Sequence, residues 1–220
     1  MSTEIIPNFY HGSLQKRLLD IGLSLVGVII SLPLFVVFAI LIKLTAKGPV
    51  FFKQKRLGKN AKMFQLIKFR TMVDNAPSRQ WRYRDLNEAD GPVFKIRNDP
   101  RYTAFGKLLA RTGLDELPQS LNVIRGEMSL VGPRPLPVDE AKKLNREQKI
   151  RELVKPGITS SWVISGTHSL KFNQWMELDR RYVEKASLLD DLDILMKTAL
   201  MILKALTKMV LGLFSLKKAN

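Results

Sequence analysis

The sequence predicts an α/β (α+β) protein that is mostly helical, has a small β-sheet and is anchored to a membrane. An apolar run from Leu18 to Ile42 is long enough to enter or cross a bilayer core of roughly 30 Å. Two short segments between residues 50 and 72 have the alternation of β-strands. Much of the remaining chain places apolar side chains at helical spacing, opposite charged ones.

The chain is strongly basic, which narrows the classes of partner. Its 220 residues include 36 Lys and Arg against 20 Asp and Glu, a formal net charge of +16. Such a charge predicts a polyanionic partner: nucleic acid, an anionic membrane surface or a phosphorylated substrate. A nucleic-acid-binding protein would leave the apolar run unexplained, and no aromatic-basic binding module is visible. The absence of cysteine excludes disulfides and thiolate metal sites.

Residues 1–47 are expected to form a polar lead-in followed by a membrane helix. Pro33 removes a backbone hydrogen bond in the middle of the apolar run, and the hydroxyl of Ser31 is close enough in sequence to help satisfy the freed carbonyl. Basic residues flank both ends of the run: Lys16, Arg17, Lys43, Lys47, Lys53, Lys55 and Arg56. If both flanks stay cytoplasmic, the segment is a re-entrant hairpin that bends at Ser31 and Pro33. An ordinary kinked span is the alternative.

Residues 48–193 are expected to form a cytoplasmic catalytic domain that begins with the sheet. Val50–Phe52 and Phe64–Met72 have the character of strands, separated by a basic segment and a turn. In the second strand Lys68 and Arg70 share one face, an arrangement that suits a diphosphate. A solvated basic strand edge explains the same pattern. The polar segment from Val73 to Asn98 is interpreted as a loop.

An adjacent acid pair, Asp115 and Glu116, follows a short amphipathic helix predicted from Tyr102 to Arg111 and opened by Asp99. Gly113 is expected to break this helix, which places the pair in a turn or at the start of the next helix. Because consecutive side chains point in different directions, the two carboxylates are expected to divide two roles, such as nucleophile and metal ligand. On spacing alone, acidic residues that complement a helix dipole explain the pair better.

The segments after the acid pair complete the predicted domain. Arg134 is flanked by two prolines that fix the backbone around it, which suits phosphate binding, although on this segment alone a structural turn explains the prolines better. A helix is predicted over Asp139–Val154, a strand over Ile158–Gly166 and a helix over Lys171–Ala186. Asp190, Asp191 and Asp193 are expected to cap the last helix. Residues 194–220 form an amphipathic helix that can lie in a membrane interface or bind a partner.

Taken in order, several motifs resemble the bacterial sugar transferase family, the monotopic phosphoglycosyl transferases. The resemblance runs from about Lys16 to Lys197 and rests on Gly48-Pro-Val-Phe-Phe52, Lys68-Phe-Arg-Thr-Met72, Asp90-Gly-Pro, Asn98-Asp-Pro-Arg101, Leu114-Asp-Glu-Leu-Pro-Gln119, Gly126-Glu-Met-Ser-Leu-Val-Gly-Pro-Arg-Pro135 and Pro156-Gly-Ile-Thr159. Each motif is weak alone, and their number and order make the match strong. The chain resembles the compact form of the family.

The resemblance implies a specific reaction and a specific site. Family members transfer a sugar 1-phosphate from a UDP-sugar to polyprenyl (undecaprenyl) phosphate and release UMP, in the first membrane step of polysaccharide or glycoconjugate synthesis. It implies that Asp115 is the nucleophile and that Glu116 binds Mg²⁺. The substrate-binding residues carried over are Lys68, Arg70, Arg111, Arg134 and Pro135. The resemblance also implies a kink of the membrane helix at Ser31 and Pro33, with the catalytic domain on the cytoplasmic face of the bacterial inner membrane. The expected partners extend to anionic lipids and a homodimer, and exclude nucleic acid.

The sequence departs from the family pattern at three positions. Ala110 stands where the family often has Arg, Ser160 replaces a glycine, and Thr167 replaces an Arg. His168 is more simply an incidental surface residue than a substitute donor. An inactive membrane-anchored scaffold is the alternative function, and the intact acid pair argues against it.

Overall fold

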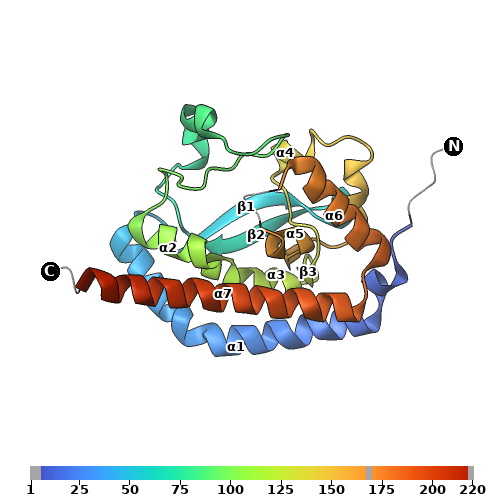
Figure 1. The fold of residues 1–220 in the computed structure, drawn as a ribbon, viewed down its shortest axis with the longest axis horizontal. Coiled ribbons are helices and arrows are strands. Elements are labelled where there is room, and N and C mark those ends of the chain that lie inside the picture. Colours follow the sequence, from blue (N-terminus) through green and yellow to red (C-terminus); the bar gives the residue numbers. More distant parts are fainter. Residues whose placement is uncertain (1–5, 167–169, 218–220) are drawn as a thin grey trace.

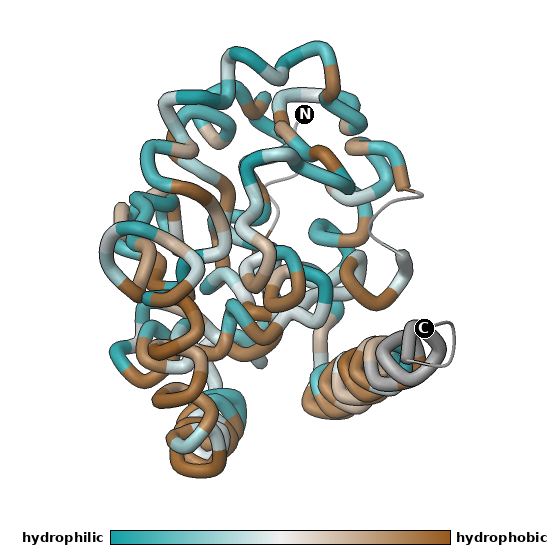
Figure 2. Tube along the Cα trace, turned by 90° about the vertical axis from the view of Figure 1, so that its left-hand side faces the viewer, coloured by the Kyte–Doolittle hydropathy of each residue, from teal (hydrophilic) through white to brown (hydrophobic). Residues whose placement is uncertain are grey.

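Two long helices run along one side of the molecule, and a globular part rests on them. The computed structural model describes residues 6–166 and 170–217. Helices α1 (Leu14–Thr45) and α7 (Leu188–Lys217) run in the same direction along the lower side in Figure 1. Figure 2, which looks along them, shows that they lie apart. The protein is therefore mostly helical with small sheets, as predicted.

The described strands form two small sheets. Strands β1 (Phe51–Leu57) and β2 (Met63–Phe69) are antiparallel, with Phe51 opposite Phe69. Strands β3 (Ser129–Val131) and β4 (Gly157–Thr159) are parallel. The basic segment expected to follow the first strand is therefore part of β1.

The strand predicted over Ile158–Gly166 is wrong beyond its first residues. After β4 the chain turns into the short helix α5 (Ser161–Ile164). Ser160 causes the change, because its hydroxyl accepts the backbone N–H of Val163 and caps the helix.

Helix α2 (Ala104–Thr112) delivers the chain to the acid pair. It begins at Thr103, whose hydroxyl accepts the N–H of Gly106 at 3.0 Å, and not at Asp99 as predicted. Asp99 is instead buried in an ion pair with Arg101. Gly106 lies so close to β2's end that a Cβ there would sit 1.9 Å from the carbonyl oxygen of Thr71. Gly113 ends the helix in the left-handed conformation, with φ of 75°.

The remaining helical elements are short, apart from α6. The helix predicted over Asp139–Val154 is wrong as a single element, because it is divided into α4 and η5. Between them, the side chains of Asn145 and Gln148 each accept the backbone N–H of the other residue, which ends the first helix and begins the second. The helix predicted over Lys171–Ala186 is confirmed as α6. The bounds are η1 Phe9–Gly12, η2 Lys59–Ala61, η3 Pro77–Leu86, η4 Leu114–Gln119, α3 Ser120–Ile124, α4 Val138–Ala141, η5 Gln148–Leu153 and α6 Phe172–Lys185.

Helix α1 stays helical through Pro33 and bends upward toward its C-terminal end in Figure 1. The hydroxyl of Ser31 donates to the carbonyl of Val28 at 3.2 Å, beside the bond that Pro33 removes. By length and composition α1 could cross a membrane, with a mean hydropathy of 3.0 over its most apolar window. Its re-entrant path through a bilayer stays a prediction.

Both ends of α1 nevertheless contact the globular part. Near its start, Arg17 donates to the carbonyls of Val123 and Ile124 at the end of α3. Near its end, Phe38 and Ile42 are buried in a cluster with Phe69 and Leu109. The whole helix therefore lies against one side of the domain.

A buried ionic network joins the starts of α1 and α7. Lys16 is only 5% exposed, and its Nζ lies 2.5 Å from Asp191 Oδ2. Tyr10 and Tyr182 donate their hydroxyls to the same carboxylate at 2.8 and 2.7 Å. Lys16 also donates to the carbonyl of Val131 in β3. Lys16 is thus a structural residue as well as a basic flank.

The three aspartates at the start of α7 have separate roles. Asp190 accepts from the backbone and hydroxyl of Ser187, which caps the helix as predicted. Asp191 belongs to the buried network, and Asp193 forms an exposed pair with Lys197. They do not converge on one point, which is why they do not form a metal site.

We expect Asp191→Asn to lower the free energy of unfolding by about 3–5 kcal/mol, because it leaves the buried ammonium of Lys16 without its counter-charge. Denaturant unfolding of detergent-solubilised protein measures the change. Asp193→Asn is the matched control on the same helix turn and should cost less than about 1 kcal/mol, because its pair is exposed. Equal losses in the two variants would contradict the assigned role of the network.

Candidate active site

The acid pair lies in the first turn of η4, directly after Gly113, as predicted. The two carboxylates have different cationic partners. Asp115 Oδ2 lies 3.7 Å from Lys68 Nζ on β2, whereas Glu116 Oε1 lies 2.7 Å from Arg134 Nη2. The 3₁₀ turn and the sheet thus separate two adjacent acids into two environments, which agrees with a division of roles.

Asp115 is the more enclosed of the two acids. Its side chain is 8% exposed, and burial raises the pKa of its carboxyl group above the usual range. The ammonium of Lys68 acts in the opposite direction and lowers that pKa, while the charge of Glu116 raises it. Lys68 is therefore the main described group that favours the ionised form of Asp115.

Arg134 is held rigidly between its two prolines. Its backbone carbonyl accepts a hydrogen bond from Arg151 at 2.6 Å, and the carbonyl of Pro135 accepts one from Arg56 at 2.8 Å. Glu116 raises the pKa of the Arg134 guanidinium, which stays charged. The segment therefore presents a fixed cation beside Glu116.

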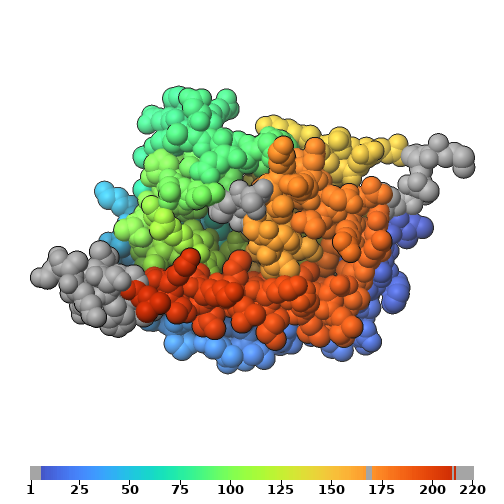
Figure 3. Space-filling view, viewed as in Figure 1, coloured from blue at the N-terminus to red at the C-terminus, as the bar shows by residue number. Residues whose placement is uncertain are grey.

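A cavity of about 620 Å³ opens beside Glu116 and Arg134. Figure 3 shows a hollow above α7, between the green α2 segment and the orange α5 and α6 segments. Its walls carry seven cations and three carboxylates: Arg56, Lys95, Arg97, Lys107, Arg111, Arg134 and Arg151 against Glu116, Glu140 and Asp179. This excess of positive charge favours an anionic ligand such as a diphosphate.

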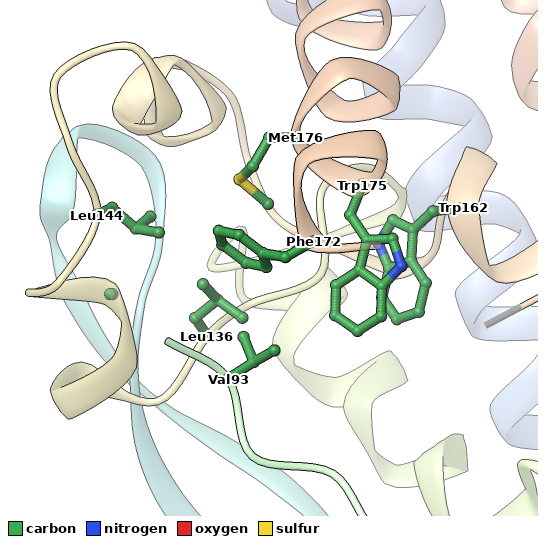
Figure 4. Close-up of a cluster of buried hydrophobic side chains, with 8 residues drawn as sticks. Val93, Leu136, Leu144, Trp162, Phe172, Trp175 and Met176 are labelled. Carbon is green, nitrogen blue, oxygen red and sulfur yellow. The ribbon is translucent and has the colours of Figure 1, made fainter. Parts of the chain in front are cut away.

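An aromatic pair forms part of the cavity wall. The rings of Trp162 and Trp175 stack with their centroids 4.7 Å apart and their planes at 14° (Figure 4). Lys95 Nζ lies 5.9 and 5.4 Å from the two ring centroids. Burial lowers the pKa of Lys95 to about 8.

The structure brings most of the predicted site residues together. Glu116, Arg111, Arg134 and Pro135 line the cavity. Asp115 and Lys68 form an ion pair next to Glu116 and are not among the residues of the cavity wall. Arg111 also donates to Asn98 at 2.8 Å.

Arg70 lies elsewhere. It donates to the carbonyl of Pro49 at 2.7 Å and pairs with Asp74, and it is not among the residues of the cavity wall. Strand β2 ends at Phe69, so the shared strand face expected for Lys68 and Arg70 does not continue to Arg70.

Of the positions that depart from the family pattern, Ala110 lines the cavity and Ser160 caps α5. Thr167 and His168 lie outside the described residues.

Several cavity residues had not been assigned a role from the sequence. Arg151 and Asp179 form a buried pair 3.0 Å apart, and burial raises the pKa of Asp179 to about 6. Tyr102 reaches the cavity because its backbone bridges to Met72. Trp175 of α6 also lines the cavity. These residues come from distant segments, so spacing along the chain gives no signal for their convergence.

The acidic residues around the cavity limit how a divalent cation could be held. The described residues contain no group of three or more His, Cys, Asp or Glu side chains placed to hold a metal ion. Mg²⁺ commonly needs only one or two carboxylates when substrate phosphates supply further oxygens. Glu116, which lines the cavity, fits that limited role.

Comparison with known proteins identifies the family. The sequence model described as "Bacterial sugar transferase" matches residues 11–205. The exopolysaccharide production protein ExoY of Sinorhizobium fredii is 37% identical over 191 residues, which cover 85% of this chain and 84% of ExoY.

Two longer relatives match over a similar stretch. The galactosyl transferase CpsE of Streptococcus agalactiae is 39% identical over 197 residues, 88% of this chain and 43% of CpsE. The undecaprenyl-phosphate galactose phosphotransferase of Salmonella typhimurium is 37% identical over 198 residues, 86% of this chain and 40% of that protein. The chain thus spans less than half the length of these two relatives. With the family model matched over most of its residues, the chain belongs to the bacterial sugar transferase family.

Proposed function

We propose that this protein transfers a sugar 1-phosphate from a UDP-sugar to polyprenyl phosphate, of which undecaprenyl phosphate is one form, and releases UMP. The observation that carries the proposal is the acid pair: its carboxylates have separate cationic partners, and Glu116 and Arg134 lie on the wall of a strongly cationic cavity. Family membership supports a sugar transferase, and one relative is named for galactose phosphate transfer to undecaprenyl phosphate.

In the first step, a carboxylate oxygen of Asp115 attacks the phosphorus that carries the sugar. The bond from this phosphorus to the bridging oxygen breaks, and UMP leaves with the electron pair. Lys68 supports the step because it favours the ionised carboxylate. The product is an aspartyl phosphosugar.

In the second step, a phosphate oxygen of polyprenyl phosphate attacks the same phosphorus. The acyl phosphate bond breaks, Asp115 is restored as a carboxylate, and the sugar leaves on a polyprenyl diphosphate. Splitting the exchange in this way lets a soluble donor product depart before a lipid reacts. Arg111 and Arg134, which line the cavity, are placed to contact phosphate oxygens.

Mg²⁺ is the proposed cofactor, with Glu116 as its protein ligand and donor phosphates as further ligands. When bound, it would neutralise charge on the departing phosphate. The chain's own contribution is to hold Glu116 at the cavity through Arg134.

We place the protein on the cytoplasmic face of the bacterial inner membrane. Large apolar side chains are exposed along α1 and α7, among them Leu18, Ile29, Ile30, Val36, Leu189, Met196 and Leu203. Because both ends of α1 contact the same globular part, a helix that enters and leaves by one leaflet keeps that part on one side. The net charge of +16 favours anionic lipids.

Asp115→Asn and Glu116→Gln should each lower UMP release by about 10³-fold or more, because each removes a reacting or charge-stabilising group. The measurement uses nanodisc-embedded protein, a panel of UDP-sugars, undecaprenyl phosphate and Mg²⁺. Intact mass without acceptor should show one added phosphosugar on the wild type and none on Asp115→Asn. Asp139→Asn, a change at an exposed acid, is the control. A folded wild type that uses no UDP-sugar would overturn the proposal in favour of a scaffold.

Lys68→Met should move the acidic limb of the pH–rate profile to higher pH. The lysine lowers the pKa of Asp115, so its loss lets burial raise that pKa further. The rate of the UMP burst should therefore fall more at pH 6 than at pH 8, because less Asp115 is ionised at the lower pH. Lys68→Arg keeps the charge and should keep the profile near that of the wild type. A uniform loss across pH in Lys68→Met would count against this role.

The membrane path of α1 can be tested with single cysteines, because the chain has none of its own. Ile5→Cys and Lys62→Cys flank the helix, and both should react with an impermeant maleimide only in inside-out vesicles. Labelling of the two positions from opposite sides would show that α1 crosses the bilayer.

A further inference from the structure

Helix α7 presents different residues to the cavity and to the outside. Thr198, Met201, Ile202 and Ala205 line the cavity. Their spacing of three, four and seven residues places them on one face of the helix. At about 100° per residue, the opposite face carries most of the exposed large apolar side chains of α7: Leu189, Leu192, Met196, Leu200 and Leu203. Met201 is also exposed, but it lies on the cavity face. One helix therefore forms both an exposed apolar surface and a wall of the active-site cavity.

The inner face of α7 is fixed in place. The hydroxyls of Thr198 and Thr159 lie 2.7 Å apart, which joins α7 to β4. One turn earlier, Ile194 is buried in the same cluster as Tyr182. These contacts fix the position of α7, so the apolar residues that follow Thr198 are held against the cavity.

The α2 wall of the same cavity is basic. Lys107, Ala110 and Arg111 line it with spacings of three and four residues, so they also share one helix face. Ala110 adds only a methyl group between the two cations.

We propose that the lipid acceptor enters the cavity across α7, with its isoprenoid chain on Met201, Ile202 and Ala205 and its phosphate held by Lys107 and Arg111. This inference rests on the proposed function and assigns a path for its second substrate. The acceptor is an apolar chain that ends in an anion, and it needs an apolar surface continuous with a cationic one. The cavity joins those two surfaces, and its apolar wall belongs to the helix whose other face is proposed to lie in the membrane.

The donor has no comparable use for the apolar wall. A nucleotide sugar is polar along its length, and apolar side chains would leave its hydrogen-bonding groups unpaired. The two substrates are therefore expected to use different walls and to meet at the acid pair. Changes on the inner face of α7 should affect the second step alone.

The two half-reactions separate these effects. Ala205→Phe fills the cavity wall, and Leu203→Phe places the same ring on the exposed face of the same helix as a matched control. We expect both variants in nanodiscs to keep the acceptor-free UMP burst within about twofold of the wild type. Transfer from the phosphosugar enzyme to undecaprenyl phosphate should fall at least about tenfold in Ala205→Phe and little in Leu203→Phe.

The phosphate end of the path needs a separate variant. Lys107→Met should raise the acceptor concentration needed for half-maximal transfer, both for undecaprenyl phosphate and for a short prenyl phosphate, because both carry the same anion. Ala205→Phe should impair the short acceptor less than the long one. A general loss of transfer independent of chain length would indicate that the ring distorts the site.

A binding measurement tests the proposed acceptor path independently of the reaction. A fluorescent prenyl phosphate should bind the wild type and Leu203→Phe more tightly than Ala205→Phe. An uncharged prenol analogue should bind the wild type and Lys107→Met equally, because it has no phosphate for Lys107 to contact. If the wild type gives no UMP burst but this pattern of binding holds, the proposed function fails and the path stands. Equal binding by Ala205→Phe and Leu203→Phe, or equal transfer by the two, would overturn the path.

Discussion

The buried contact between Lys16 and Asp191 holds the architecture together. It ties the first turn of α1 to the first turn of α7, and the tyrosines around it bring in the N-terminal segment and α6. The pair therefore aligns the starts of the two helices, which run in the same direction along one side of the molecule (Figure 1). The contact between Thr198 and Thr159 then helps to hold α7 as a wall of the cavity.

The site itself depends on an imbalance of charge. Cations outnumber carboxylates around the cavity, and the two acids of the pair are each held by a different cation. Repulsion between adjacent carboxylates is thereby reduced. Burial raises the pKa of Asp115, and Lys68 offsets part of this rise. The same cations also favour a phosphorylated ligand.

Local patterns in the sequence predicted the features that local chemistry decides. The long apolar helix, the break at Gly113 and the position of the acid pair at the start of a helical turn follow from composition, glycine and proline. The helix over Asp139–Val154 failed because side-chain hydrogen bonds at Asn145 outweighed its periodicity. Arg151 and Asp179, 28 positions apart in sequence, pair only after the chain has folded. For the same reason, the amphipathic pattern of the last helix did not reveal that its less exposed face lines the cavity.

The backbone contact at Gly106 fixes the position of the acid pair relative to β2. There α2 rests on the end of β2 through bare backbone, with less room than a methyl group needs. Side chains can change rotamer to absorb a disturbance, but two backbones in direct contact cannot. The turn that carries Asp115 begins eight residues later, at Leu114, and Lys68 lies three residues before Thr71. Asp115 and Lys68 are thus both positioned by this one rigid contact between main-chain segments.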